Sequence, residues 1–168
     1  MNCNSALLIE SENVALSQIG VTELSNRNDG KEIEKYESAV GIPKYSAYCY
    51  AAQYWSFKNA CLKLKMNYDS IPIPKSGLAN SCFNFAIKNG IKKAYLPTKN
   101  SFIIWRAPNK INGHIERIYL IGKSGWVTTI AFNTSDKSSG KQGVFFKKRN
   151  IYHQLGILTI RGMVGFND

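Results

Sequence analysis

Apolar side chains recur at helical spacing near the middle of the first half of the chain. Five of them, between residues 50 and 64, are separated by four or three positions, which is the repeat of one helical face. They are Tyr50, Tyr54, Phe57, Cys61 and Leu64. Pro43 ends any preceding helix, and Ser46 is a suitable capping residue. We therefore predict a buried helix that begins near Cys49 and continues to about Lys65.

Three further helices are predicted from the same kind of spacing. They cover residues 12–19, 31–40 and 77–88. Gly20 and Gly41 end the first two, and Ser76 is placed to cap the third. The polar residues 21–30 and the proline-containing residues 67–75 are predicted to be loops.

After residue 100 the pattern changes to short β-rich runs separated by turn-forming residues. The runs cover residues 101–106, 113–121, 126–132, 143–148 and 157–161. Helices followed by an antiparallel meander are typical of the α+β class, with the helices packed on the sheet. At 168 residues the chain is long enough for one sizeable core, so we predict a single domain over residues 1–168.

The net charge of +11 is unevenly distributed along the chain. Residues 1–40 contain seven acidic and three basic residues, a net −4, whereas residues 41–168 contain four acidic and nineteen basic residues, a net +15. A body this basic attracts polyanions such as nucleic acid, anionic lipid or an acidic cell-wall polymer. The charge alone does not choose among them.

The first ten residues do not resemble a secretory signal. They lack a basic segment, and their apolar run, residues 6–9, is only four residues long. No apolar run approaches the roughly 20 residues that span a bilayer. We therefore expect the protein to be made in the cytoplasm without a signal peptide and to lack a transmembrane segment.

The cysteines are scattered rather than paired. Cys3, Cys49, Cys61 and Cys82 form no C-x-x-C motif, so neither a zinc site nor a disulfide framework is predicted. Cys61 and Cys82 fall on apolar helices and are predicted to be core residues. Cys49 falls at the first turn of its helix, where free N–H groups and the positive dipole end stabilise a thiolate. On this stretch alone, a reactive and a structural Cys49 remain equally open.

Two histidines could serve a reactive thiol as proton acceptor. His114 opens the run 115–121, whereas His153 lies in a predicted loop between strands. A thiol nucleophile needs a histidine, which a third polar group orients. Asn133, at the end of the next β-rich run, can fill that role. Papain-like enzymes share this order, with a cysteine on an early helix, a histidine that opens a strand and an asparagine that closes the next strand. Spacing alone nevertheless leaves His153 open as the base.

Several segments spread over nearly the whole chain carry a resemblance to a known family. They are residues 15–23, the motif Tyr48-Cys49-Tyr50-Ala51-Ala52, residues 102–105 with Gly113-His114-Ile115, residues 126–130 with Asn133-Thr134-Ser135, and residues 143–149. In these segments the chain resembles the NlpC/P60 and CHAP superfamily of cysteine peptidases and amidases. The resemblance is to the form found in phage endolysins and small bacterial cell-wall hydrolases.

The resemblance implies a papain-like fold and assigns roles to individual residues. Cys49 would be the nucleophile, His114 the general base and acid, and Asn133 the residue that orients His114. The oxyanion hole would use the Cys49 N–H and a second donor, for which Tyr36 and Tyr48 are candidates. The same two tyrosines are candidates for contacts with the substrate. Trp105 is a further candidate for such a contact, although a core position is the simpler expectation for it. No metal or cofactor is required.

Two departures from the family pattern bear on the site. Relatives often carry Glu-Gly-Asn where this chain has Ala131-Phe132-Asn133, so Asn133 would have to orient His114 alone. The usual Gly-Asp turn is replaced by Asn100-Ser101. Neither change removes the nucleophile or the base, and an active enzyme is expected.

The sequence thus predicts a monomeric cysteine hydrolase of peptidoglycan that resembles an endolysin and acts on the cell wall. An amidase toxin of the same fold, injected into rival bacteria, is the alternative enzyme. A non-catalytic basic domain that binds nucleic acid is the alternative from another class. For that class the sequence offers charge but no helix-turn-helix, aromatic ribonucleoprotein motif or zinc site.

Overall fold

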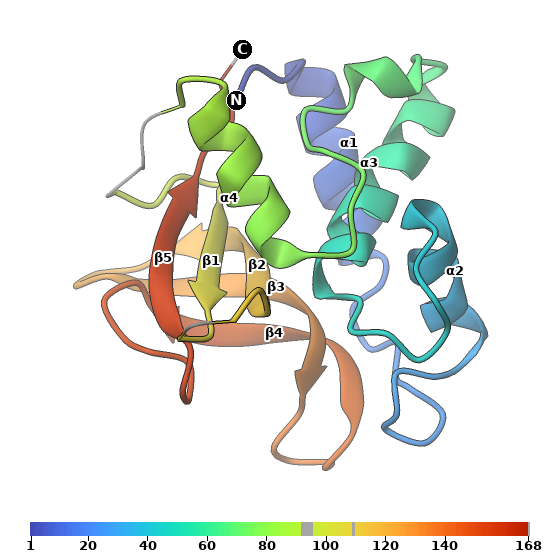
Figure 1. Ribbon diagram of the computed structural model, residues 1–168, viewed down its shortest axis with the longest axis vertical. Helices are drawn as coiled ribbons and strands as arrows, with labels where there is room; N and C mark the ends of the chain where they lie inside the picture. The colour runs from blue at the N-terminus through green and yellow to red at the C-terminus, as the bar shows by residue number, and fades with distance from the viewer. Residues whose placement is uncertain (92–95, 109, 168) are drawn as a thin grey trace.

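The computed structural model describes residues 1–91, 96–108 and 110–167. Within these residues, helices occupy the first half of the chain and a single sheet the second half (Figure 1). The helices are α1 (Ser5–Leu16), α2 (Lys31–Val40), α3 (Cys49–Leu64), the short 3₁₀ helix η1 (Tyr68–Ser70) and α4 (Ala79–Lys88). The predicted α+β class is confirmed.

The sheet is antiparallel throughout and has the strand order β4-β3-β2-β1-β5. Its strands are β1 (Phe102–Arg106), β2 (Gly113–Ile121), β3 (Trp126–Ser135), β4 (Gln142–Asn150) and β5 (Thr159–Val164). The first four strands form the predicted meander. The last strand does not extend it but returns to the opposite edge, beside β1.

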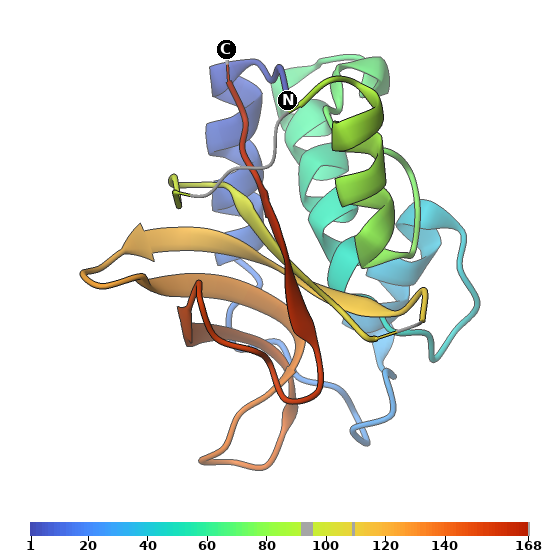
Figure 2. The ribbon, with the colours of Figure 1, turned by 60° about the vertical axis from the view of Figure 1, so that its left-hand side comes forward.

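The helices gather against one side of the sheet (Figure 2). α3 contacts β2 and β3, α4 contacts β1, β2 and β5, and both α1 and α2 pack on α3. Alternate residues of β1 pack into two different hydrophobic clusters. Phe102 and Ile104 pack with the helices, whereas Ile103 and Trp105 pack with Ile151 and other residues near the β4–β5 connection.

The predicted first helix was misplaced. α1 begins at Ser5 rather than residue 12, because Asn4 caps it by accepting a hydrogen bond from the Leu7 N–H at 3.2 Å. Burial of Leu7, which is 0% exposed, favours the same start. α1 also ends at Leu16 rather than residue 19.

Two other predicted elements begin two residues later than expected. α4 begins at Ala79 rather than residue 77, because the Ser76 hydroxyl accepts the Leu78 N–H at 3.1 Å and organises the turn before the helix. The last strand runs over residues 159–164 instead of 157–161. Its register is set by pairing with β1, and Ile157 remains 79% exposed in the preceding turn.

The two ends of the described chain lie together (Figure 1). The Met1 ammonium donates to the Gly165 carbonyl at 2.7 Å, and Asn2 pairs with Asn167 in a parallel bridge. Among the helices of the described residues, none is both long and apolar enough to span a bilayer.

Candidate active site

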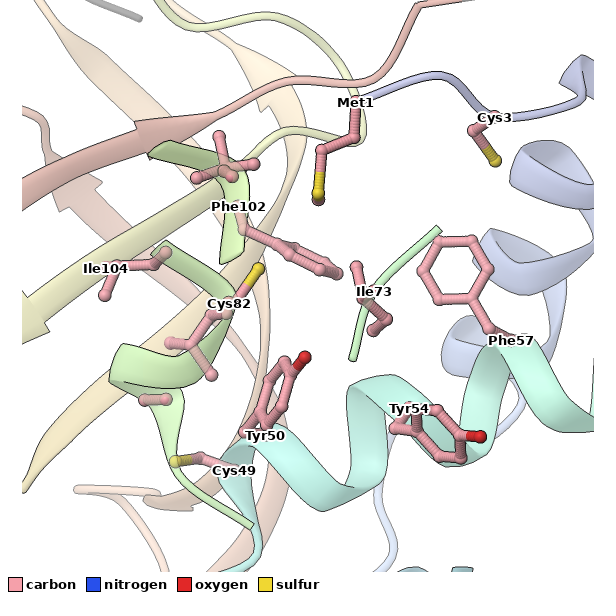
Figure 3. Packing of buried hydrophobic residues seen from close by; sticks show 14 of the residues in the cluster. Met1, Cys3, Cys49, Tyr50, Tyr54, Phe57, Ile73, Cys82, Phe102 and Ile104 are labelled. Carbon is pink, nitrogen blue, oxygen red and sulfur yellow. The ribbon is translucent and has the colours of Figure 1, made fainter. Parts of the chain in front are cut away.

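Cys49 is the first residue of α3, and no side chain caps this end of the helix. The leading N–H groups of a helix have no partner within it, and they add to the positive end of the helix dipole. Figure 3 places Cys49 at the first turn of α3, at the margin of the apolar cluster. The residue is 4% exposed. Its position at the start of the helix is therefore the one that the sequence predicted.

A cleft of about 520 Å³ opens beside Cys49. The loop before α3, the loop before α4 and the end of the β1–β2 connection line it. Two glycines allow these segments to approach closely. A Cβ at Gly77 would lie 2.6 Å from a methyl group of Ile42, and one at Gly113 would lie 2.3 Å from the Trp105 carbonyl oxygen. A larger residue at position 77 would force the cleft walls apart, and one at position 113 would push β2 away from β1.

His114 is the second residue of β2, and its imidazole interacts with the Cys49 side chain. The ring nitrogen Nε2 lies 3.0 Å from Glu116 Oε1. Because a carboxylate only accepts hydrogen bonds, Nε2 carries the proton in this contact, which leaves Nδ1 as the nitrogen that can exchange a proton with a thiol. The ring also packs on Trp105, its cross-strand partner, with centroids 6.0 Å apart. The His114 side chain is 12% exposed.

Glu116 is completely buried and held from several directions. Arg149 donates to both of its oxygens, at 2.7 Å from Nη2 and at 3.0 and 3.1 Å from Nε. The Thr129 hydroxyl donates to Oε2 at 2.5 Å. A buried carboxylate is costly unless it is paired and hydrogen-bonded, and both conditions are met here. These contacts fix Glu116 in the position from which it holds His114.

The electrostatics of the site favour a charged imidazole. Burial by itself lowers the pKa of His114, but hydrogen bonds and charges from Cys49 and Glu116 outweigh it and raise the pKa well above its usual range. Burial alone would raise the pKa of Glu116, but His114 and Arg149 hold it well below its usual range. The site therefore stabilises an imidazolium between the Cys49 side chain and an ionised carboxylate.

The prediction that Asn133 orients His114 is wrong. Its Oδ1 accepts the backbone N–H of Tyr48 at 3.3 Å, and its Nδ2 donates to Asn28 Oδ1 at 2.7 Å and to Glu23 Oε1 at 3.4 Å. The residue has a positive φ of 55° within β3, where the pairing of β3 with β4 is interrupted between Ala131 and Thr134. Asn133 therefore anchors the residue preceding Cys49 and leaves the imidazole to Glu116.

Sequence reasoning missed Glu116, although a signal was present. Residues two apart on a strand point to the same side, so a strand that begins with His114 brings Glu116 onto the face of the imidazole. The family resemblance instead pointed to a position on β3. That position is Ala131, which is buried. The carboxylate comes from β2 in this chain.

His153 lies in the loop between β4 and β5, and its contacts are with other residues. Its side chain is exposed and packs edge-on against Trp126, with ring centroids 6.1 Å apart. Its backbone oxygen accepts a hydrogen bond from the Trp105 indole at 3.4 Å. Between the two histidines, the structure thus brings only His114 to Cys49.

The three aromatic residues considered as substrate contacts are all buried and none lines the cleft. Tyr36 and Tyr48 are 0% exposed and Trp105 is 1% exposed. The Tyr36 hydroxyl donates to Gln18 at 2.8 Å, and the Tyr48 hydroxyl donates to Glu23 at 2.9 Å. Both hydroxyls are engaged away from the cleft, so the prediction of substrate contact is wrong for these side chains. Trp105 instead packs against the His114 ring.

The other cysteines occupy the interior. Cys61 and Cys82 are 0% exposed, and burial raises the pKa of both thiols, that of Cys82 to about 12. Cys49, Cys61 and Cys82 form no disulfide. Within residues 1–91, 96–108 and 110–167, no cluster of three or more histidine, cysteine or acidic side chains could hold a metal ion.

Together, these residues can carry out nucleophilic chemistry on a carbonyl group. A thiol at a helix N-terminus contacts an imidazole, a buried carboxylate orients that imidazole, and an open cleft reaches the thiol. Comparisons with protein-family models, with curated proteins and with solved structures found no match.

Proposed function

We propose that the chain is a papain-like cysteine hydrolase that cleaves an amide bond in the peptide stem of peptidoglycan. The observation that carries the proposal is the contact series Cys49–His114–Glu116 at the head of the cleft. Catalysis of this kind requires a nucleophile, a base and a residue that orients the base, and Cys49, His114 and Glu116 fill these roles in turn.

The reaction begins with His114 holding the proton of the Cys49 thiol. The thiolate attacks the amide carbon, and a carbon–sulfur bond forms as the carbonyl electron pair moves onto oxygen. The Cys49 N–H, at the uncapped start of α3, donates to this oxyanion. His114 then gives its proton to the departing amine, the carbon–nitrogen bond breaks, and an acyl-enzyme remains.

Water completes the cycle. His114, now neutral, accepts a proton from a water molecule as the water attacks the thioester. The tetrahedral intermediate collapses, the carboxylic acid leaves, and Cys49 recovers its proton through His114. Glu116 holds the ring in one orientation and stabilises the imidazolium in both half-reactions, while Arg149 keeps Glu116 ionised.

Peptidoglycan is the proposed substrate on two grounds. The motifs around Cys49 and His114 resemble those of cell-wall cysteine peptidases and amidases. The net +15 of residues 41–168 suits an enzyme that must approach an anionic wall. We propose an endolysin-like role, in which the protein is made in the cytoplasm and reaches the wall when the membrane is opened. An amidase toxin delivered to a rival cell would use the same site.

Digestion of purified sacculi tests the proposal. The native chain is expected to release fragments with new amino and carboxyl ends and without new reducing sugar ends, as read by mass spectrometry. Cys49→Ser is expected to release none, whereas Cys82→Ala, which removes a thiol outside the site, still releases them. New reducing ends, or equal release by Cys49→Ser, would contradict a cysteine amidohydrolase. Binding of nucleic acid without any release would support the non-catalytic alternative.

A further inference from the structure

A second, smaller pocket of about 230 Å³ adjoins the catalytic cleft. It lies between α4, the β1–β2 connection and β5. Leu78 lines both the pocket and the cleft. Asn80, which lines the pocket, donates through Nδ2 to the carbonyls of Ile111 and Asn112, at 2.7 and 3.4 Å. Asn112 in turn lines the cleft, so one rim separates the pocket from the space beside Cys49.

Two arginines, Arg106 and Arg161, line this pocket. Neither forms an ion pair with a carboxylate in the part of the chain that the structure describes. Arg161 is only partly exposed, and burial together with the charge of Arg106 lowers its pKa. Two cations thus face the same small space without a counter-ion.

The sequence around the pocket offers no acid to neutralise them. Asp69 is followed by only three acidic residues, at positions 116, 136 and 168. Glu116 is bound by His114 and Arg149, and Asp136 binds the hydroxyls of its own loop. Position 168 lies outside the described residues. An uncompensated, partly buried cation is costly, and an incoming anion removes that cost.

The guanidinium of Arg161 is already oriented. Nη1 donates to Asn80 Oδ1 and Nη2 donates to Asn84 Oδ1, each at 2.6 Å. The group lies over the Phe83 ring, 4.5 Å from its centroid. The two amide oxygens fix the plane of the Arg161 guanidinium without neutralising its charge. A guanidinium has five N–H donors, and these contacts use two of them. The remaining donors suit a carboxylate, which arginine binds in a planar, two-pronged arrangement.

We propose that this pocket binds a free carboxylate of the substrate, so that the enzyme prefers peptides bearing one on a residue near the scissile bond. The inference rests on the proposed function, since it assigns the pocket to the same substrate. Arg161 is the principal donor, and the more exposed Arg106 adds charge at the pocket mouth.

The test uses soluble stem peptides in which each free carboxylate is converted in turn to a carboxamide. For the native chain, one of these conversions is expected to raise KM about tenfold or more, because a hydrogen-bonded charge pair is lost. Arg161→Gln is expected to raise KM for the acid peptide by a similar factor and to abolish the difference between acid and amide. Lys88→Gln, which removes an exposed charge from α4, the helix beside the pocket, should preserve the native preference.

The outcomes separate the pocket from the chemistry. Equal hydrolysis of acid and amide peptides by the native chain would overturn the carboxylate site and leave the proposed function intact. If no peptide is hydrolysed, calorimetric binding to Cys49→Ser decides the pocket alone: tighter binding of the acid supports it and equal binding overturns it. If Arg161→Gln does not fold, Arg106→Gln provides the same comparison. Displacement of the acid peptide by an equal concentration of inorganic phosphate would assign the pocket to phosphate instead.

Discussion

His114 Nε2 lies 3.0 Å from Glu116 Oε1, and the two residues are two positions apart on β2. One strand therefore supplies both the proposed base and the group that orients it. Arg149, from β4, donates from Nη2 to the same carboxylate oxygen at 2.7 Å. The orientation of the imidazole thus depends on the pairing of β2, β3 and β4 as a unit.

Glu116→Gln tests this relationship through the pH profile. Removing the carboxylate leaves the imidazolium without its partner, so kcat/KM is expected to fall by about 10²- to 10⁴-fold. Glu116 contributes to the raised pKa of His114, so its loss lowers that pKa and moves the alkaline limb of the profile to lower pH. Glu32→Gln, which removes a partly exposed carboxylate that pairs with Lys35 outside the site, is the matched control. An unmoved alkaline limb would show that Glu116 does not act through His114.

The same carboxylate makes stability sensitive to acid. The folded-state pKa of Glu116 is depressed, so its contribution is present above the ordinary carboxyl value of 4.5 and is lost as pH falls towards the folded value. We expect the free energy of unfolding, measured with urea, to fall in this window for the native chain. Glu116→Gln should show a shallower fall even though it is less stable overall. Equal slopes for the two proteins would contradict the assignment.

Asn133 combines two roles that substitutions can separate. Asn133→Gly keeps a backbone that tolerates the φ of 55° but loses the contacts to Tyr48 and Asn28. It is expected to cost about 1–2 kcal/mol of stability. Asn133→Ala adds the cost of a left-handed residue, a further ~1 kcal/mol. Thermal unfolding measures both. Activity should fall less than in Glu116→Gln, and an alanine variant more stable than the glycine variant would refute this explanation.

The two histidines give a simple contrast. His153→Ala removes a side chain that contacts Trp126 at the surface, and it should keep the native kcat/KM. His114→Ala should lose nearly all of it, because the base and the nucleophile act as a unit. Cell-wall digestion by the two variants is the assay. The reverse pattern would transfer the role of base to His153.

Charge should affect wall binding more than chemistry. The attraction between the net +15 of residues 41–168 and an anionic wall is screened beyond a Debye length of about 8 Å at physiological salt. Binding to sacculi should therefore weaken as salt rises, while hydrolysis of a neutral soluble peptide changes little. Equal salt dependence for both substrates would mean that the charge has no targeting role.

The elements most faithfully predicted were those with a strong local pattern. α2 was predicted at its observed bounds, and α3 begins at Cys49 as its apolar repeat indicated. Errors arose where tertiary pairing decides the outcome. β5 is placed by β1 rather than by its own apolar run, and α1 starts where Asn4 caps it and Leu7 finds a core. The spacing of apolar residues within a segment does not reveal these contacts.

For the site, the resemblance predicted the pairing of Cys49 with His114 but not the carboxylate of Glu116. The start of a helix is a local property, so the place of Cys49 in the first turn of α3 could be predicted from its neighbours alone. Choosing Asn133 required knowing which side chains of β3 face the imidazole. That geometry depends on the irregular pairing between Ala131 and Thr134, which no periodic pattern reveals. The contact of Glu116 with Arg149 joins residues 33 positions apart and is likewise tertiary.

The most direct measurement is kcat/KM on one soluble stem peptide for the native chain, Cys49→Ser, His114→Ala and the double variant. If Cys49 and His114 act as one unit, each single substitution removes nearly all hydrolysis and the double variant is no worse than the weaker single one. Native-like hydrolysis by Cys49→Ser, or losses that multiply in the double variant, would contradict a thiol nucleophile served by His114.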